Sequence, residues 1–202
     1  MIIVITGTTS GVGLALTQAL KPNHTVVSLN RHDVDLSDIT QVQNFSLPHC
    51  DILINCAGTG IGGKIDFVNH NIDDCVKILN VNTVSPVLLT HKALKINKNC
   101  KIVNITSTNN NRYWPNDLVY SLSKKSLSEF SKMLKVEYAS ANVLEVCLGL
   151  TKTNFNDSRY KNCADRHIDI YSQNPHLEPA TVAGKIVEAL FDDTVKYIEI
   201  AP

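Results

Sequence analysis

The sequence predicts one α/β domain over residues 1–202, with helices on both faces of a doubly wound parallel sheet, which gives three layers. Short apolar, β-branched runs alternate along the chain with segments whose apolar residues recur every three or four positions. No internal repeat, low-complexity tract or linker divides the 202 residues. A chain of this length buries roughly 70% of its unfolded surface, so one domain suffices.

The composition narrows the classes of function. Lysine plus arginine and aspartate plus glutamate each number 19, so no charge excess favours nucleic acid or an anionic membrane. No apolar run approaches the roughly 20 residues that span a bilayer, and no basic leader precedes the first strand. We therefore expect a cytoplasmic protein that binds neither membranes nor nucleic acids.

The cysteines and histidines carry no motif. The six cysteines, Cys163 among them, form no C-x-x-C pair, and the seven histidines show no metal-binding spacing. We expect free thiols and no metal site.

The first element is a strand at residues 2–5, followed by a glycine-rich turn at residues 6–13 and a helix to residue 20. Three of the nine glycines, Gly7, Gly11 and Gly13, lie in this turn. The unpaired N–H groups at a helix N-terminus bind phosphate, and glycine lets a diphosphate approach the backbone closely. The alternative is an ordinary strand-to-helix turn whose glycines serve only steric needs.

The second strand is expected at residues 24–30, with Arg31 at its end. Residues 35–37 are interpreted as a very short strand beside the nucleotide site. Ser37 is expected to cap a short helix that runs to about residue 45.

The remaining elements continue the alternation. Asp117 is expected to cap the helix that begins after it. The predicted strands are residues 51–57, 101–107, 143–148 and 195–200; the predicted helices are residues 72–96, interrupted near 81–86, then 118–134 and 179–191. Residues 109–116 are polar and irregular, and residues 154–176 are interpreted as a substrate loop or lid.

Ligands of such sheets bind outside the carboxyl ends of the strands, and several polar motifs lie there. They are residues 6–13, residues 55–58, Ser107, and Tyr120 with Lys124. Tyr120 and Lys124 are four residues apart, so both side chains project from one face of a helix.

Together these motifs resemble the short-chain dehydrogenase/reductase family, in its short single-domain branch. The matching residues are Thr6, Gly7, Gly11 and Gly13 of T-G-x-x-x-G-x-G, Asn55, Ala57 and Gly58 of N-x-A-G, Asn82, Ser107, and Tyr120 and Lys124 of Y-x-x-x-K. The resemblance covers residues 1 to about 153. It implies a Rossmann-type fold and an oxidoreductase that interconverts a carbonyl and a secondary alcohol.

The residue types suit this chemistry. Tyr120 can donate or accept the proton at the substrate oxygen, and a nearby Lys124 favours the phenolate, whose ordinary pKa is about 10. Ser107 can hydrogen-bond the substrate oxygen. The resemblance further implies that Lys124 binds the ribose hydroxyls and that Asn82 holds a water.

The cofactor is expected to be NADP(H) rather than NAD(H). Asn30 occupies the position where NAD-preferring sites carry a carboxylate, which would repel a 2′-phosphate, and Arg31, which follows it, can pair with that phosphate through two hydrogen bonds. The predicted cofactor-binding residues are Gly7, Thr9, Ser10, Gly11, Val12, Gly13, Asn30, Arg31, Asp35, Leu36, Asn55, Ala57, Gly58, Tyr120, Lys124, Gly149, Thr151 and Thr153.

The substrate is expected to be a small carbonyl or alcohol, bound by Ser107, Trp114 and Tyr120, with Arg112 and Tyr113 as further candidates. The family's usual Pro-Gly is replaced by Leu148-Gly149, which implies a changed loop. Family habit implies a homodimer or homotetramer through helices near residues 78–96 and 117–139. A non-catalytic NADP(H)-binding sensor and an epimerase or dehydratase remain as competing interpretations.

Overall fold

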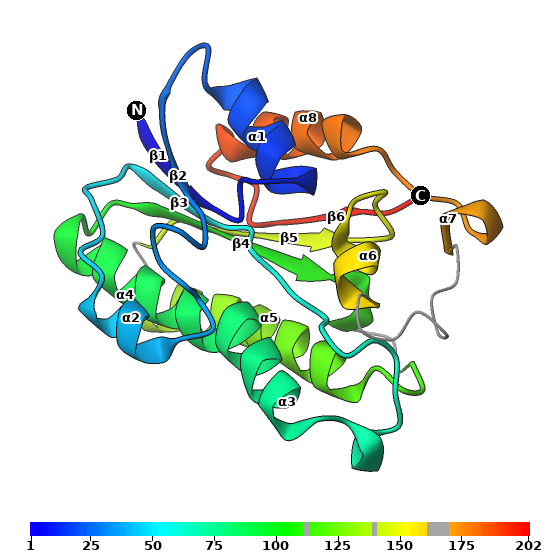
Figure 1. The fold of residues 1–202 in the computed structure, drawn as a ribbon. Coiled ribbons are helices and arrows are strands. Elements are labelled where there is room, and N and C mark those ends of the chain that lie inside the picture. The colour runs from blue at the N-terminus through cyan, green and yellow to red at the C-terminus, as the bar shows by residue number, and fades with distance from the viewer. Residues whose placement is uncertain (111–113, 139–140, 161–169) are drawn as a thin grey trace.

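The computed structural model describes residues 1–110, 114–138, 141–160 and 170–202, and their strands form one parallel sheet (Figure 1). The strand order is β2-β1-β3-β4-β5-β6. The strands are β1 Ile2–Thr6, β2 Thr25–Leu29, β3 Ile52–Asn55, β4 Lys101–Ser107, β5 Val143–Leu148 and β6 Tyr197–Ile200. Each paired neighbour is parallel, as the alternating sequence pattern predicts.

Helices cover the sheet on both sides, which gives the predicted three layers (Figure 1). α1 Gly11–Leu20 and α8 Pro179–Leu190 lie together on one face. α2 Ile39–Asn44, α4 Ser85–Ile96 and α5 Leu118–Glu137 lie on the other, with α3 Ile72–Leu79 against α5.

Alternation along the strands divides the core in two. Ile3 and Ile5 of β1 face the core under α1 and α8, whereas Val4 faces the core under α4 and α5. All three side chains are fully buried. Successive side chains of a strand point to opposite faces, so a continuous apolar run is what a strand covered on both sides requires.

The predicted interruption of the long helix is a π-helix. Residues Asn80–Val84 form it between α3 and α4, and Asn82 lies inside it, fully buried. π-Helical turns are rare and are frequent at functional sites.

The predicted strand at residues 35–37 is wrong. Asp35 Oδ1 accepts hydrogen bonds from the backbone N–H and the hydroxyl of Ser37, at 2.9 and 2.8 Å, and this local turn replaces strand pairing. The cap of α2 is Asp38 rather than Ser37, because the Asp38 carboxylate accepts from the backbone N–H groups of Thr40 and Gln41.

The segment after β5 is more ordered than a plain loop. It contains the short helices α6 Phe155–Arg159 and α7 Ile170–Gln173. Thr151 and Leu177 form a parallel bridge, with hydrogen bonds from Lys152 N to Leu177 O and from Leu177 N to Leu150 O, at 2.8 and 2.9 Å. The part of the predicted lid at residues 161–169, and Cys163 with it, lies outside the described residues.

Candidate active site

A cleft of about 1060 Å³ opens at the carboxyl edge of the sheet, between the strand ends and α6. It collects nearly all of the predicted site residues. These are Gly7, Thr9, Ser10, Gly11, Val12, Gly13, Asn30, Arg31, Asp35, Leu36, Ala57, Gly58, Ser107, Trp114, Tyr120, Lys124, Gly149, Thr151 and Thr153. Asn55 and Asn82 do not line the cleft, and Arg112 and Tyr113 lie outside the described residues.

The glycine turn between β1 and α1 forms one end of this cleft. Gly7 and Gly11 have φ of 74° and 55°, which side-chain-bearing residues rarely adopt. A Cβ at Gly7 would lie 2.7 Å from the Cα of Ala57, and a Cβ at Gly13 would lie 2.2 Å from the carbonyl oxygen of Gly7. The Ser10 side chain does not cap α1, so its first N–H groups stay available to a diphosphate.

Thr6 joins this turn to the end of β3. Its hydroxyl accepts hydrogen bonds from Cys56 N and Ala57 N, at 3.0 and 3.1 Å. Asn55, predicted to bind the cofactor, instead turns into the protein, where Nδ2 donates to Thr90 Oγ1 and Asn104 Oδ1 at 3.2 and 2.8 Å. Asn55 therefore supports the wall of the cleft without facing it.

Ser107, Tyr120 and Lys124 lie together at the middle of the cleft, as Y-x-x-x-K after β4 predicts. Ser107 ends β4, and its hydroxyl accepts a hydrogen bond from Asn109 N at 3.2 Å. Lys124 Nζ donates to the Ile105 carbonyl at 2.9 Å. Gly58 admits this ammonium, because a Cβ there would lie 3.3 Å from Nζ.

The pKa of Tyr120 is shifted mainly by burial. Burial raises it, and the opposing effects of Arg159 and of the Ser107 hydrogen bond are smaller. Burial also lowers the pKa of Lys124 to about 8. Burial therefore opposes the expected lowering of the Tyr120 pKa by Lys124 and an oxidised nicotinamide, which stays a prediction.

Asn82 fixes the backbone beside Lys124. Its Oδ1 accepts from Thr59 N at 2.8 Å, and its Nδ2 donates to Thr59 O at 2.8 Å and to Ser123 Oγ at 2.9 Å. Both Nδ2 protons are thus used within the protein, whereas Oδ1 can accept one more hydrogen bond.

Arg31 lies at the end of β2, exposed at the rim of the cleft. Its side chain is 80% exposed, and its Nε is 3.9 Å from Asp35 Oδ2. The neighbouring turn is held by Asn30, whose N–H donates to Asp33 Oδ2 and whose Oδ1 accepts from His32 N, both at 2.9 Å. A weak, exposed ion pair leaves the guanidinium able to reach a phosphate.

Three residues that line the cleft were not assigned to it from the sequence: Asp117, Phe155 and Arg159. Asp117 begins α5 but makes no cap hydrogen bond; instead it accepts hydrogen bonds from Arg159 and from Asn109 Nδ2. Burial raises the pKa of Asp117, while the charges of Arg159 and Lys64 oppose this. The partners are 42 residues apart, so no local spacing could indicate the pair.

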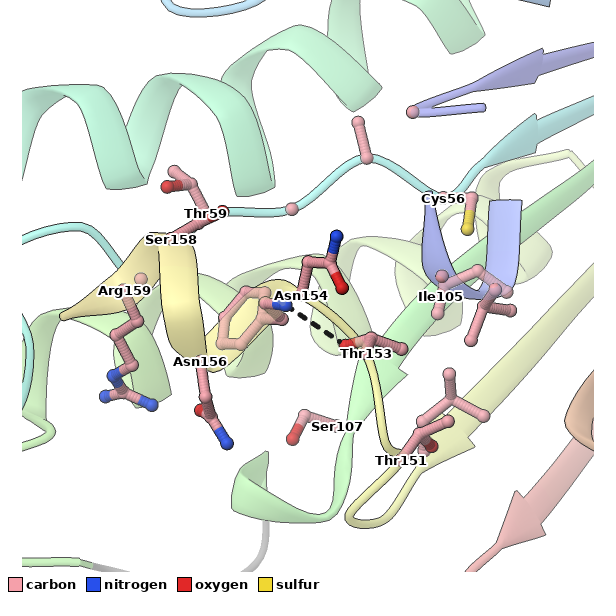
Figure 2. Close-up of a pocket in the computed structure, with 18 of the residues that line it drawn as sticks. Cys56, Thr59, Ile105, Ser107, Thr151, Thr153, Asn154, Asn156, Ser158 and Arg159 are labelled. Carbon is pink, nitrogen blue, oxygen red and sulfur yellow. Dashed lines mark hydrogen bonds between the residues drawn. The ribbon is translucent and has the colours of Figure 1, made fainter. Parts of the chain in front are cut away.

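The same helix α6 covers the ring of Tyr120. Arg159 Cζ lies 5.1 Å from the ring centroid, and the Phe155 ring lies 5.6 Å away at 55°. Figure 2 shows Asn156 and Arg159 extending from the same side of α6, with Ser107 nearby. Trp114, half exposed, lies under Lys64, whose Nζ is 5.5 Å from its ring.

The backbone that enters α6 is fixed by Tyr171 of α7. The Tyr171 hydroxyl donates toward the carbonyls of Thr151 and Thr153, at 3.2 and 3.0 Å, and accepts from Thr153 N. Thr153 in turn accepts from Phe155 N, the dashed contact in Figure 2.

Among the described residues, no group of acidic, cysteine or histidine side chains forms a metal site. No helix in the same residues is both long and apolar enough to cross a bilayer.

Comparison with known sequences places this site in context. The family model described as short chain dehydrogenase matches residues 34–164. The protein named "Probable short-chain type dehydrogenase/reductase VdlC", from Helicobacter pylori, is 28% identical over 93% of this chain and 78% of its own length. YdfG of Shigella flexneri, named as an NADP-dependent 3-hydroxy acid dehydrogenase, is 25% identical over 92% and 87%.

Solved structures share the fold. A serine dehydrogenase complexed with NADP+ superposes with a TM-score of 0.82 at 22% identity, covering 99% of this chain and 94% of its own. A 4-hydroxyisoleucine dehydrogenase complexed with NADH gives 0.80 at 23% identity, covering 99% and 96%.

Proposed function

This chain belongs to the short-chain dehydrogenase/reductase family of oxidoreductases, and we propose that it interconverts a carbonyl and a secondary alcohol with NADP(H). The nicotinamide, when bound, supplies or takes the hydride. The single observation that supports this most is that Ser107, Tyr120 and Lys124 line one cleft, with Tyr120 one helical turn from Lys124 on α5.

Tyr120 and Ser107 would hold the reacting oxygen between them. The raised pKa of Tyr120 keeps the phenol protonated near neutrality, which suits proton donation to a carbonyl oxygen during reduction. Oxidation of an alcohol needs the phenolate, which the positive charges of Arg159 and Lys124 would favour. Ser107 would stabilise the charge that develops on the same oxygen.

The residues present fit a dinucleotide. The turn at Gly7, Gly11 and Gly13 leaves a cradle that any Cβ would obstruct, and the uncapped start of α1 offers N–H groups to the diphosphate. Lys124 would bind the ribose hydroxyls from the floor of the cleft. The serine dehydrogenase structure with NADP+ and a small-chain dehydrogenase structure with NADPH support this cofactor class.

The preference for the 2′-phosphate would rest on Arg31. Arg31→Asp should raise the KM for NADPH about 10- to 100-fold, because it exchanges a charge-assisted hydrogen bond for repulsion, and should change the KM for NADH little. Lys95→Asp, at an exposed cation on α4, is the matched control. Equal effects on both cofactors would contradict the NADP(H) assignment.

Tyr120→Phe tests the proton donor. An NADPH-consumption screen over grouped carbonyls first finds a substrate, and the variant should then lose about 10²- to 10⁴-fold in kcat while its Kd for NADPH stays within about threefold. Tyr138→Phe, half exposed at the end of α5, is the control. A Tyr120→Phe enzyme with ordinary turnover would contradict the role, and NADPH binding without turnover on any carbonyl would favour a non-catalytic sensor.

We also propose a homo-oligomer. Large apolar side chains lie exposed on α5: Leu118, Leu122, Met133 and Val136. Such a surface is typical of an interface. Sedimentation velocity at micromolar concentration tests this, and a monomer throughout would contradict it.

A further inference from the structure

The proposed hydride transfer uses only the charge of Arg159, which lies in the wall of the cleft beside Tyr120. It ends α6, is 6% exposed, and its guanidinium lies against the tyrosine ring with Cζ 5.1 Å from the centroid. A buried arginine is costly to desolvate, so each of its N–H groups is expected to have a hydrogen-bond acceptor.

Within the part of the chain that the structure describes, one N–H donor of Arg159 has no hydrogen-bond acceptor. The Nη2 of Arg159 donates to Asp117, whereas Nε is buried and has no hydrogen-bond partner among the described residues. A buried charged donor without an acceptor loses its hydrogen bonds to water and forms none in the protein, which costs free energy of folding. The cleft reaches Arg159, so an anion bound there would meet the guanidinium and offset its charge.

The charge of the cleft also favours an anion. The chain has a formal net charge of zero, but the described lining residues include four cations, Arg31, Lys64, Lys124 and Arg159, against two carboxylates, Asp35 and Asp117. Asp35 lies near Arg31 at the dinucleotide end. At the other end, one carboxylate, Asp117, faces two cations, Arg159 and Lys64, which leaves one positive charge in excess.

We propose that the substrate is a hydroxy acid or oxo acid whose carboxylate is bound by the Arg159 guanidinium and by Lys64, while Tyr120 and Ser107 hold the reacting oxygen. This inference rests on the proposed function. Because the guanidinium lies against the ring of the same tyrosine that handles this oxygen, the carboxylate and the reacting carbon are a few bonds apart. The reaction converts the hydroxy acid and NADP+ to the oxo acid, NADPH and one proton.

The test compares acids with their neutral esters. kcat/KM with NADP+ is measured for 2- and 3-hydroxybutyrate and for their methyl esters. The wild-type protein should prefer at least one acid over its ester about 10-fold or more. In Arg159→Gln/Asp117→Asn, which removes both charges and leaves no buried carboxylate unpaired, this ratio should fall to about one. Asp117→Asn alone should keep the preference, and Lys64→Gln should reduce it a few-fold.

A binding measurement separates recognition from turnover. Calorimetric titration of Tyr120→Phe with the preferred acid in the presence of NADP+ should give a Kd about 10-fold weaker when the double substitution is added. Esters turned over as well as acids, or an acid preference that survives the double substitution, would overturn the carboxylate site while leaving the oxidoreductase intact. No turnover of these four compounds or of any carbonyl in the wider screen would overturn the proposed function itself.

Discussion

Gly13→Ala should push α1 away from the turn that follows β1. The variant tests how far stability and dinucleotide binding depend on the close contact between Gly13 and the Gly7 carbonyl. The added Cβ would lie 2.2 Å from the Gly7 carbonyl oxygen and 2.9 Å from its carbonyl carbon. A close C···O contact is about 3.3 Å, so α1 must move away from the turn by about 1 Å. Both atoms that obstruct it are backbone, and neither can rotate aside.

The displacement has two measurable costs. Overpacking of this kind destabilises by about 1–3 kcal/mol, and we expect the upper part of that range because Val12 and Leu16 of α1 are buried in the core. A misplacement of about 1 Å at the N-terminus of α1 should weaken NADPH binding by about 10²-fold. Urea unfolding followed by circular dichroism gives the first quantity, and fluorescence titration with NADPH the second.

Gly184→Ala is the matched control. Gly184 lies within α8, and a Cβ there would meet nothing within 4 Å. Alanine in a helix interior is favoured over glycine by about 0.5–1 kcal/mol, so this variant should be more stable than wild type and bind NADPH equally. Unchanged stability and unchanged NADPH affinity in Gly13→Ala would refute the reasoning.

Two further predictions concern the residues around the proposed proton donor. Burial lowers the pKa of Lys124 from 10.5 to about 8, so the unfolded chain binds more protons between these values and wild-type stability rises with pH through that window. Lys124→Met should therefore raise the free energy of unfolding by about 2–3 kcal/mol at pH 7, with the difference shrinking by pH 10, and a pH-independent difference in urea unfolding would contradict it. Asn82→Ala should lose about 3 kcal/mol because three buried hydrogen bonds disappear, whereas Asn80→Ala, which loses the single bond to Ser37 O, should lose about 1 kcal/mol. Similar losses in the two urea-unfolding curves would show that the Thr59 contacts of Asn82 carry no special weight.

The elements that the sequence predicted well are those whose signal is local. The sequence predicts a strand at residues 101–107, and β4 begins and ends there, because four of its seven residues are β-branched and the strand is buried on both faces. The sequence also predicts the glycine turn, because positive φ and close backbone contact both require glycine at fixed positions.

The predictions were wrong where a side chain could hydrogen-bond either to a neighbour in the sequence or to a residue far along the chain. Asp35 satisfies the backbone two residues on, which ends any tendency of residues 35–37 to pair as a strand. Asp117 does the reverse: it leaves the helix start uncapped and binds Arg159, far along the chain. The sign of the Tyr120 pKa shift likewise depends on burial, which the Y-x-x-x-K spacing does not reveal.

The bridge between Thr151 and Leu177 has a practical consequence for redesign. It holds both ends of the intervening segment beside β5. A replacement segment would therefore join two ends that are already close together, and the entropy cost of closing the loop would be small. Of the residues predicted to bind the dinucleotide, only Thr153 lies within this segment, and it should be kept. Transplanting residues 152–176 from a relative is therefore the shortest route to altering which molecule this protein accepts.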